Sequence, residues 1–141
     1  MTVETVSVSD LSVPCNLPLF LERVSAGFPS PADDYMEDRL DLNRYLVKHP
    51  AATFFVRASG DSMIGAGIHS GDILVVDRSL EPANNSVVIA ALNGELTVKR
   101  LVKTAGRLHL VPENERHRPI EIREGMDFEV WGVVTNVIHA L

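Results

Sequence analysis

From residue 52 to the C-terminus, β-branched and aromatic residues come in short runs that end at glycine, asparagine or aspartate. Runs of this length and composition are typical of β-strands. The dipeptide Asn93-Gly94 separates two of the runs and predicts a tight hairpin turn. The pattern therefore predicts an antiparallel β domain. Its expected strands are ATFFVRA, DILVVD, SVVIAAL, LTVKRLV, RLHLV and FEVWGVVTNVI.

The part of the chain before this region has a different pattern. Residues 1–29 contain short apolar patches and three prolines without a sustained helix or strand period, and we expect them to form a flexible arm. From Ser30, a helix-capping residue precedes hydrophobic positions at helical spacing, and Asp41 offers a second helix start. We expect one or two short helices that end before Pro50. The predicted organisation is an arm over residues 1–29 and a folded domain over residues 30–141.

Composition and charge limit the classes of function. The 141 residues, 45% of them hydrophobic, are enough for one core but few for two ordinary domains. A formal net charge of -6 makes specific binding to DNA unexpected, because a phosphate backbone would repel the chain as a whole. Cys15 is the single cysteine, no Lys or Arg precedes Arg23, and no apolar run approaches the roughly 18–20 residues of a bilayer span. These features favour a cytoplasmic protein without a membrane segment.

Ser62 stands in a glycine-rich turn, SGDSMIGAG, between two expected strands. The ordinary interpretation is a turn residue, since Ser, Gly and Asp favour turns by local hydrogen bonding. A nucleophile of the α/β-hydrolase type is excluded because Met63 and Ile64 follow the serine where that motif has x-Gly. None of the five histidines stands in a recognisable catalytic context. A nucleophilic Ser62 would therefore need another base.

Lys99 is the alternative base. Alternation along its strand places Thr97, Lys99 and Leu101 on one face. A free lysine has a pKa near 10.4, so about 1 in 2,500 is neutral at pH 7, and burial would have to lower the pKa by about 3–5 units. The ordinary interpretation is a strand lysine with its ammonium in water. The spacing alone leaves both interpretations open.

Three aspartates, Asp61, Asp72 and Asp77, lie close together in the sequence. Their spacing fits no EF-hand loop, and we interpret them as turn residues. We therefore expect no metal site and no cofactor.

Four segments together resemble the UmuD-like SOS mutagenesis proteins of the LexA-like self-cleaving peptidase family. They are FPSPADDYMEDRLDLN, HPAATFFVRASGDSMIGAGIHSGDILVVD, ELTVKRL and VWGVVTNVIHAL, and the resemblance begins at about Leu17. The resemblance implies a mainly β, LexA- and signal-peptidase-like antiparallel domain with a small helical region and a flexible N-terminal arm.

The resemblance also implies the site residues. Ser62 would be the nucleophile of a Ser-Lys dyad and Lys99 its general base, 37 positions later. The bond that is cut would be Ala26-Gly27, within SAGFPSPA. Backbone N–H groups of Ser62 and Met63 are the expected oxyanion donors.

A biological role follows from the same resemblance. A RecA filament on single-stranded DNA is expected to stimulate self-cleavage after DNA damage. The shortened chain is expected to form a homodimer and to act as accessory subunit of a UmuC-like error-prone polymerase in translesion synthesis. Two departures from the family pattern are the first sixteen residues and Ala26, where UmuD-like proteins often carry cysteine.

Three other functions compete with this interpretation. A LexA-like repressor would need an N-terminal DNA-binding domain, and the 26 residues before the expected cut are poor in Lys and Arg. A signal peptidase shares the Ser-Lys pair but is anchored in a membrane. An interaction module or regulator of a translesion polymerase, with Ser62 and Lys99 as a vestigial dyad, is not excluded by the sequence.

Overall fold

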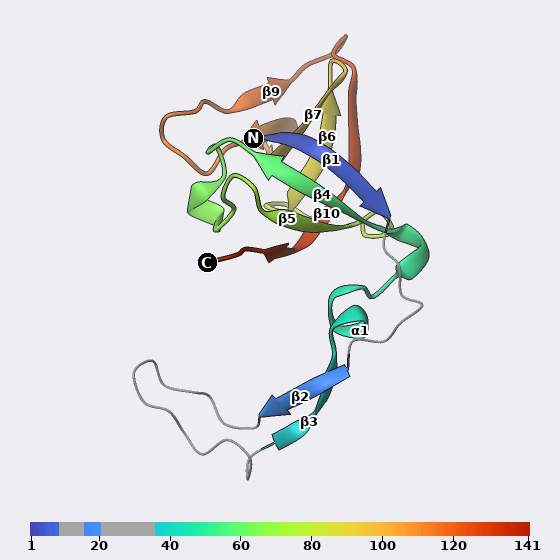
Figure 1. Cartoon of the computed structure of the whole chain (residues 1–141). Helices are drawn as coiled ribbons and strands as arrows, with labels where there is room; N and C mark the ends of the chain where they lie inside the picture. The colour runs from blue at the N-terminus through green and yellow to red at the C-terminus, as the bar shows by residue number, and fades with distance from the viewer. Residues whose placement is uncertain (9–15, 21–35) are drawn as a thin grey trace. The chain divides into compact units, whose positions relative to one another are not determined.

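The computed structural model describes residues 1–8, 16–20 and 36–141 (Figure 1). They belong to two compact units, one made of Met1–Ser9 with His49–Leu141 and the other of Asp10–Lys48. The boundary expected between residues 29 and 30 lies outside the described residues and stays a prediction. No helix in the described segments is long and apolar enough to cross a membrane.

An antiparallel sheet of eight strands forms the larger unit. Its strand order is β1-β4-β5-β10-β6-β7-β8-β9, and β1 also pairs with β7, which joins the first six strands of this order into a ring (Figure 1). The strands predicted after residue 52 are confirmed. The bounds are β1 Thr2–Val8, β4 Thr53–Ser59, β5 Ile73–Asp77, β6 Val87–Leu92, β7 Glu95–Thr104, β8 Arg107–Val111, β9 Ile120–Ile122 and β10 Phe128–Ile138, with 3-10 turns η2 at Pro50–Ala52 and η3 at Ile64–Ala66.

The first strand differs from the sequence prediction, which expected residues 1–29 to form an arm without strands. Strand β1 pairs with β4 from Thr2↔Ser59 to Val8↔Phe54. A register shift between Val3 and Thr5 interrupts this pairing, so the segment lacks the strict alternation by which strands are identified in a sequence. The backbone of residues 2–8 is therefore part of the sheet.

The smaller unit contains a two-stranded sheet, β2 (Asn16–Phe20) with β3 (Met36–Asp41), and helix α1 (Leu42–Leu46). The helix expected from Ser30 is wrong over Met36–Asp41, because these residues pair with β2. Pairing with a partner strand outweighed a helical pattern that is only a weak preference. The second start was correct, since Asp41 caps α1 by accepting a hydrogen bond from the Asn43 N–H at 3.0 Å.

The core of the larger unit is made of two clusters of buried side chains. β4, β5, β6, β7 and the turn after β4 supply the first cluster, and β6, β7 and β8 the second. Burial of this apolar surface fixes β6 and β7, which contribute to both clusters. The buried members include Phe54, Val56, Met63, Ile68, Leu74, Val76, Ile89 and Val98 in the first cluster, and Val88, Ala90, Leu101 and Leu110 in the second.

Gly132 is required by close packing in β10. A Cβ at this position would lie 2.7 Å from Cγ1 of Val76 and 3.0 Å from the carbonyl oxygen of Asp77. We expect Gly132→Ala to lower the free energy of unfolding by about 1–3 kcal/mol through overpacking, as measured by urea denaturation. Glu129→Ala, at an exposed position of the same strand, should change it by less than about 0.5 kcal/mol. Equal stability of the two variants would contradict the packing argument.

Candidate active site

Ser62 lies in the turn between β4 and η3. Gly60, just before it, has a φ of 96°, a conformation that favours glycine and redirects the chain at the end of β4. Ser62 is fully buried, and its carbonyl oxygen accepts a hydrogen bond from the Glu113 N–H at 2.7 Å. The Gly65 N–H in turn donates to the Glu113 carbonyl at 2.8 Å. The loop between β8 and β9, to which the sequence analysis gave no role, thus holds the turn of Ser62 in place.

Lys99 reaches Ser62 from β7. Its Nζ lies 3.1 Å from Ser62 Oγ, 2.9 Å from Thr97 Oγ1 and 3.1 Å from the Val98 carbonyl oxygen. Only 7% of Lys99 is exposed. Burial lowers the pKa of the Lys99 ammonium, because the charged form loses its hydration. The two residues that the sequence analysis selected are therefore in direct contact. The interpretation of Lys99 as a strand lysine with its amine in water is wrong.

Thr97 is a residue to which the sequence analysis assigned no role. It hydrogen-bonds to Lys99 Nζ, and its own hydroxyl also donates to the Met1 carbonyl oxygen at 2.9 Å. The signal was present in the sequence, since alternation placed Thr97 and Lys99 on the same face of the strand.

The amino group of Met1 lies at the same point and donates a hydrogen bond to Ser62 Oγ. The Met1 carbonyl oxygen accepts from the Val98 N–H at 3.2 Å, so the first residue extends along β7. Burial, helped by the neighbouring Lys99, lowers the pKa of the Met1 amine to about 5. The Met1 amine therefore contacts both the Ser62 oxygen and the Lys99 amine. The geometry shows that extended chain fits against the Ser62–Lys99 pair.

The remaining expected site residues have different outcomes. Ala26 and Gly27 lie outside the described residues. Met63 is fully buried next to Ser62, and its carbonyl oxygen accepts bonds from the N–H groups of Ala66 and Ile68 at 3.0 and 3.3 Å. These bonds fix the backbone beside Ser62. The assignment of oxyanion donors to Ser62 and Met63 stays a prediction.

The three aspartates interpreted as turn residues each bind histidine. His117 Nε2 lies 2.7 Å from Asp61 Oδ1, and His49 Nδ1 lies 2.5 Å from Asp77 Oδ2. The third, Asp72, contacts two imidazoles, those of His69 and His139. In the part of the chain that the structure describes, the groups hydrogen-bonded to Ser62 Oγ are the amines of Met1 and Lys99.

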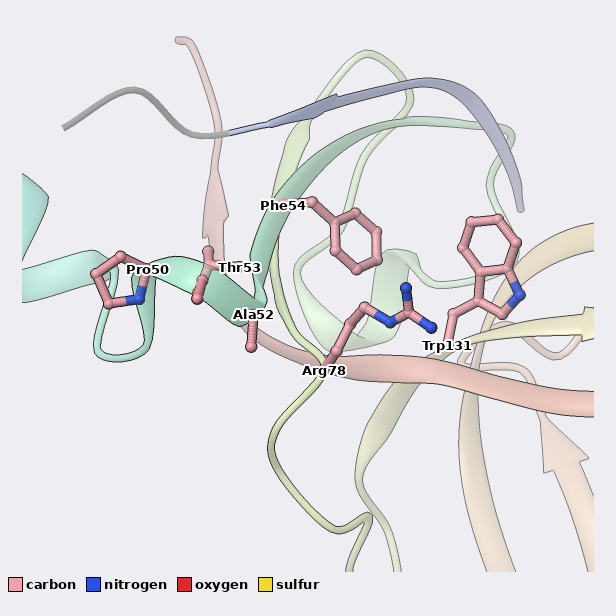
Figure 2. A pocket seen from close by; sticks show the side chains of 7 residues that line it. Pro50, Ala52, Thr53, Phe54, Arg78 and Trp131 are labelled. Carbon is pink, nitrogen blue, oxygen red and sulfur yellow. The ribbon is translucent and has the colours of Figure 1, made fainter. Parts of the chain in front are cut away.

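A separate pocket of about 270 Å³ lies at the start of β4 (Figure 2). The Phe54 and Trp131 rings form a T-shaped contact with 6.4 Å between their centroids. The Arg78 guanidinium lies 6.0 Å from the centroid of the Trp131 ring. Neither Ser62 nor Lys99 lines this pocket, so we assign it no part in the chemistry of the pair. Its lining residues are Pro50, Ala51, Ala52, Thr53, Phe54, Arg78 and Trp131.

Comparison with known proteins gives consistent matches. The family described as Peptidase S24-like matches residues 18–135, a range that contains all the expected site residues. Protein SamA of Salmonella typhimurium strain LT2 is 52% identical over 122 residues, which cover 86% of this chain and 84% of SamA. Protein MucA of Escherichia coli is 44% identical over 137 residues, 96% of this chain and 93% of MucA. LexA repressor 1 of Xanthomonas oryzae pv. oryzae is 39% identical over 124 residues, 88% of this chain and 61% of the repressor.

The lowered pKa of Lys99 can be measured directly. We expect the Lys99 side chain, followed by NMR in protein labelled with ¹³C-lysine and assigned with a Lys99→Arg variant, to titrate below the usual 10.5. Because the folded protein then binds fewer protons than the unfolded chain, the free energy of unfolding should increase with pH between the folded value and 10.5. A midpoint at or above 10.5 would show that the amine is not desolvated.

Proposed function

The chain belongs to the Peptidase S24-like family, and we propose that it cuts its own Ala26–Gly27 bond with Ser62 as nucleophile and Lys99 as general base. It is a self-cleaving protein of SOS mutagenesis, and its relatives include ImpA, MucA and a LexA repressor. The observation that carries the assignment of the pair is the distance of 3.1 Å between Lys99 Nζ and Ser62 Oγ inside a buried site.

The hydrogen bonds around Lys99 suit both of its protonation states. A neutral amine has two N–H groups and one lone pair. The N–H groups can donate to Thr97 Oγ1 and the Val98 carbonyl, which leaves the lone pair for the Ser62 hydroxyl. Once protonated, the amine donates to all three oxygens. The base therefore accepts a proton without losing a hydrogen-bond partner.

The proposed reaction has two steps. Lys99 takes the hydroxyl proton as Ser62 Oγ attacks the Ala26 carbonyl carbon, and then gives this proton to the nitrogen of Gly27 as the peptide C–N bond breaks. Water then hydrolyses the ester between Ser62 and Ala26, again with Lys99 as base. In this scheme the Ser62 and Met63 N–H groups would stabilise the oxyanion.

The Met1 amine indicates how the substrate would reach the pair. A cleavage segment that brought the Gly27 nitrogen beside Ser62 Oγ would need the position of the Met1 amine, so Met1 and this segment would compete for one place. The 35 residues from Gly27 to Ser62 can span tens of ångströms, which allows cleavage of the chain's own arm or of a partner's. The proposed assembly is a cytoplasmic homodimer, stimulated by a RecA filament on single-stranded DNA and acting with a UmuC-like polymerase. Its acidic charge suits contacts with these proteins better than direct contact with DNA.

Intact-mass analysis tests the cleavage. Incubation at alkaline pH, or with RecA, nucleotide and single-stranded DNA, should yield fragments of residues 1–26 and 27–141, with a rate that rises as pH passes through the pKa of Lys99. Ser62→Ala and Lys99→Ala should yield none, because each lacks one partner of the proton transfer. Ser79→Ala, at an exposed serine after β5 that contacts Asp77 and not the Ser62 turn, should be cut like the wild type. Cleavage at another bond, or unchanged cleavage of Ser62→Ala, would refute the assignment.

Thr97 is expected to position the base. Thr97→Val removes one hydrogen-bond partner of Lys99 Nζ, and a bond to a charged group contributes about 1.5–3 kcal/mol. We expect self-cleavage to slow by about 10- to 100-fold, with a shifted pH profile, in a time course followed by gel or mass. Thr104→Val, at the exposed end of the same strand, is the matched control. A rate and a pH profile equal to those of the control would mean that Thr97 has no such role.

A further inference from the structure

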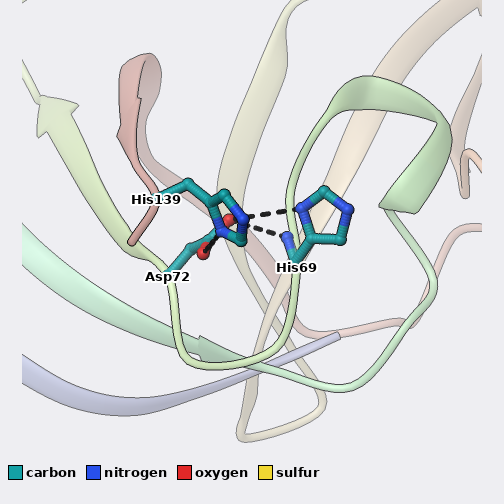
Figure 3. Close-up of side chains that lie close together, drawn as sticks. All are labelled: His69, Asp72 and His139. Carbon is teal, nitrogen blue, oxygen red and sulfur yellow. Dashed lines mark hydrogen bonds and ion pairs between the residues drawn. The ribbon is translucent and has the colours of Figure 1, made fainter. Parts of the chain in front are cut away.

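A second cluster of chemically active side chains lies where the C-terminal end of β10 meets the turn before β5 (Figure 3). We propose that His69, Asp72 and His139 form a binding site for a transition-metal ion of the Zn²⁺ class. Each residue offers one ligand atom, and the three atoms lie within 4.8 Å of one another. The site does not depend on the proposed cleavage, because among the described residues both imidazoles contact Asp72 and not Ser62 or Lys99.

Strand pairing brings the three residues together. The register of β10 with β5 ends at Ile138↔Ile73, so His139 continues past the strand directly beside Asp72. His69 is joined to Asp72 by the turn itself, in which the His69 N–H donates to Asp72 Oδ2 at 2.8 Å and the Asp72 N–H donates to the His69 carbonyl at 3.1 Å. The backbone therefore holds the carboxylate between two imidazoles without help from an ion.

The distances between the imidazole nitrogens and the Asp72 carboxylate oxygens are close to those expected around a tetrahedral ion. Bonds of about 2.0–2.2 Å to zinc place neighbouring tetrahedral ligand atoms about 3.3–3.6 Å apart. His139 Nδ1 lies 2.5 Å from Asp72 Oδ1, and His69 Nδ1 lies 3.8 Å from Asp72 Oδ2, so the present separations lie on either side of that value. Binding requires His139 to exchange its hydrogen bond with Asp72 for a bond to the metal.

Burial differs between the ligands in a way that suits an ion entering from solvent. The Asp72 side chain is 3% exposed, whereas the side chains of His69 and His139 are 51% and 42% exposed. The fixed carboxylate is thus at the base of the site and the adjustable rings are at its open side. Water can take the fourth position, as in zinc sites with three protein ligands.

The donor set selects the class of metal. Two imidazole nitrogens and one carboxylate oxygen suit Zn²⁺, Cu²⁺ or Ni²⁺. Ca²⁺ and Mg²⁺ instead prefer about six or more oxygen ligands, some of which come from water. The sequence analysis expected no metal because it considered the spacing of aspartates only, and His139 is 67 positions from Asp72. An ion here would link the C-terminal end of the chain to the turn that begins at Ser62, since the Ile68 N–H before His69 bonds to the Met63 carbonyl.

Zinc affinity of the full 141-residue chain, prepared without a polyhistidine tag, tests the site. In competition with a chromophoric chelator we expect one Zn²⁺ per chain. Co²⁺ should give the visible absorption of a tetrahedral ion. His69→Ala and His139→Ala should each weaken Zn²⁺ binding by at least about 10-fold, because even the loss of a residue that only orients a metal ligand costs that much. Both positions are half-exposed, and circular dichroism checks that the variants fold.

His49→Ala is the matched control. It removes an imidazole whose Nδ1 lies at the same 2.5 Å from a buried aspartate, Asp77, but the described residues place no second imidazole there. Its zinc affinity should stay within about 2-fold of the wild type. The same Zn²⁺ concentration should raise the Tm of the wild type and of His49→Ala by more than that of His139→Ala. Equal affinity in the wild type, His69→Ala and His139→Ala would overturn the proposal, as would an absence of binding to the wild type. Either result would leave a hydrogen-bonded His-Asp-His cluster without a metal.

Discussion

The contact between a buried lysine amine and a buried serine hydroxyl depends on the exclusion of water, and the rest of the molecule is arranged around that condition. Keeping an ordinary lysine neutral at pH 7 costs about 4.6 kcal/mol. Pairing of β7 with β6 and β8 places Lys99 inside the sheet, where it is 7% exposed, and the Met1 carbonyl oxygen binds the neighbouring Thr97 and Val98. A lysine on an edge strand would keep its hydration, so the ring of strands lowers the pKa of Lys99 as well as stabilising the fold.

Much of the larger unit could be predicted because its strands carry strong local signals. Runs such as DILVVD and SVVIAAL combine β-branched residues with clear ends, and Asn93-Gly94 identified its hairpin. The Ser62–Lys99 contact was inferred from resemblance, because the side-chain period could not tell which face of β7 is buried. Strand β1 was missed, since its bulge breaks the alternation, and β3 was taken for helix because its partner β2 is far along the chain.

The histidines show a further limit of reading a sequence. His69 is three positions from Asp72, but the other pairs are far apart along the chain, with separations of 28 positions for His49 and Asp77 and 56 for His117 and Asp61. The folded chain brings these distant groups together, so no local motif signals them. Buried Asp72 and Asp77 remain charged in spite of their burial: desolvation opposes ionisation, but hydrogen bonds from neighbouring groups outweigh it and lower both pKa values. Two charged carboxylates are thus held by hydrogen bonds at opposite ends of β5, Asp72 just before the strand and Asp77 at its last residue.

Strand β1 precedes the proposed cleavage point, whereas the strands it pairs with follow it. In the uncut chain this strand is tethered to the strands it pairs with, β4 and β7. Its effective concentration there does not depend on how much protein is present. Once the tether is severed, the same strand becomes a separate peptide held by its backbone ladder, and its occupancy obeys mass action. Dilution or a competing strand would then expose the edge of β4, a surface that the intact chain keeps covered by its own beginning.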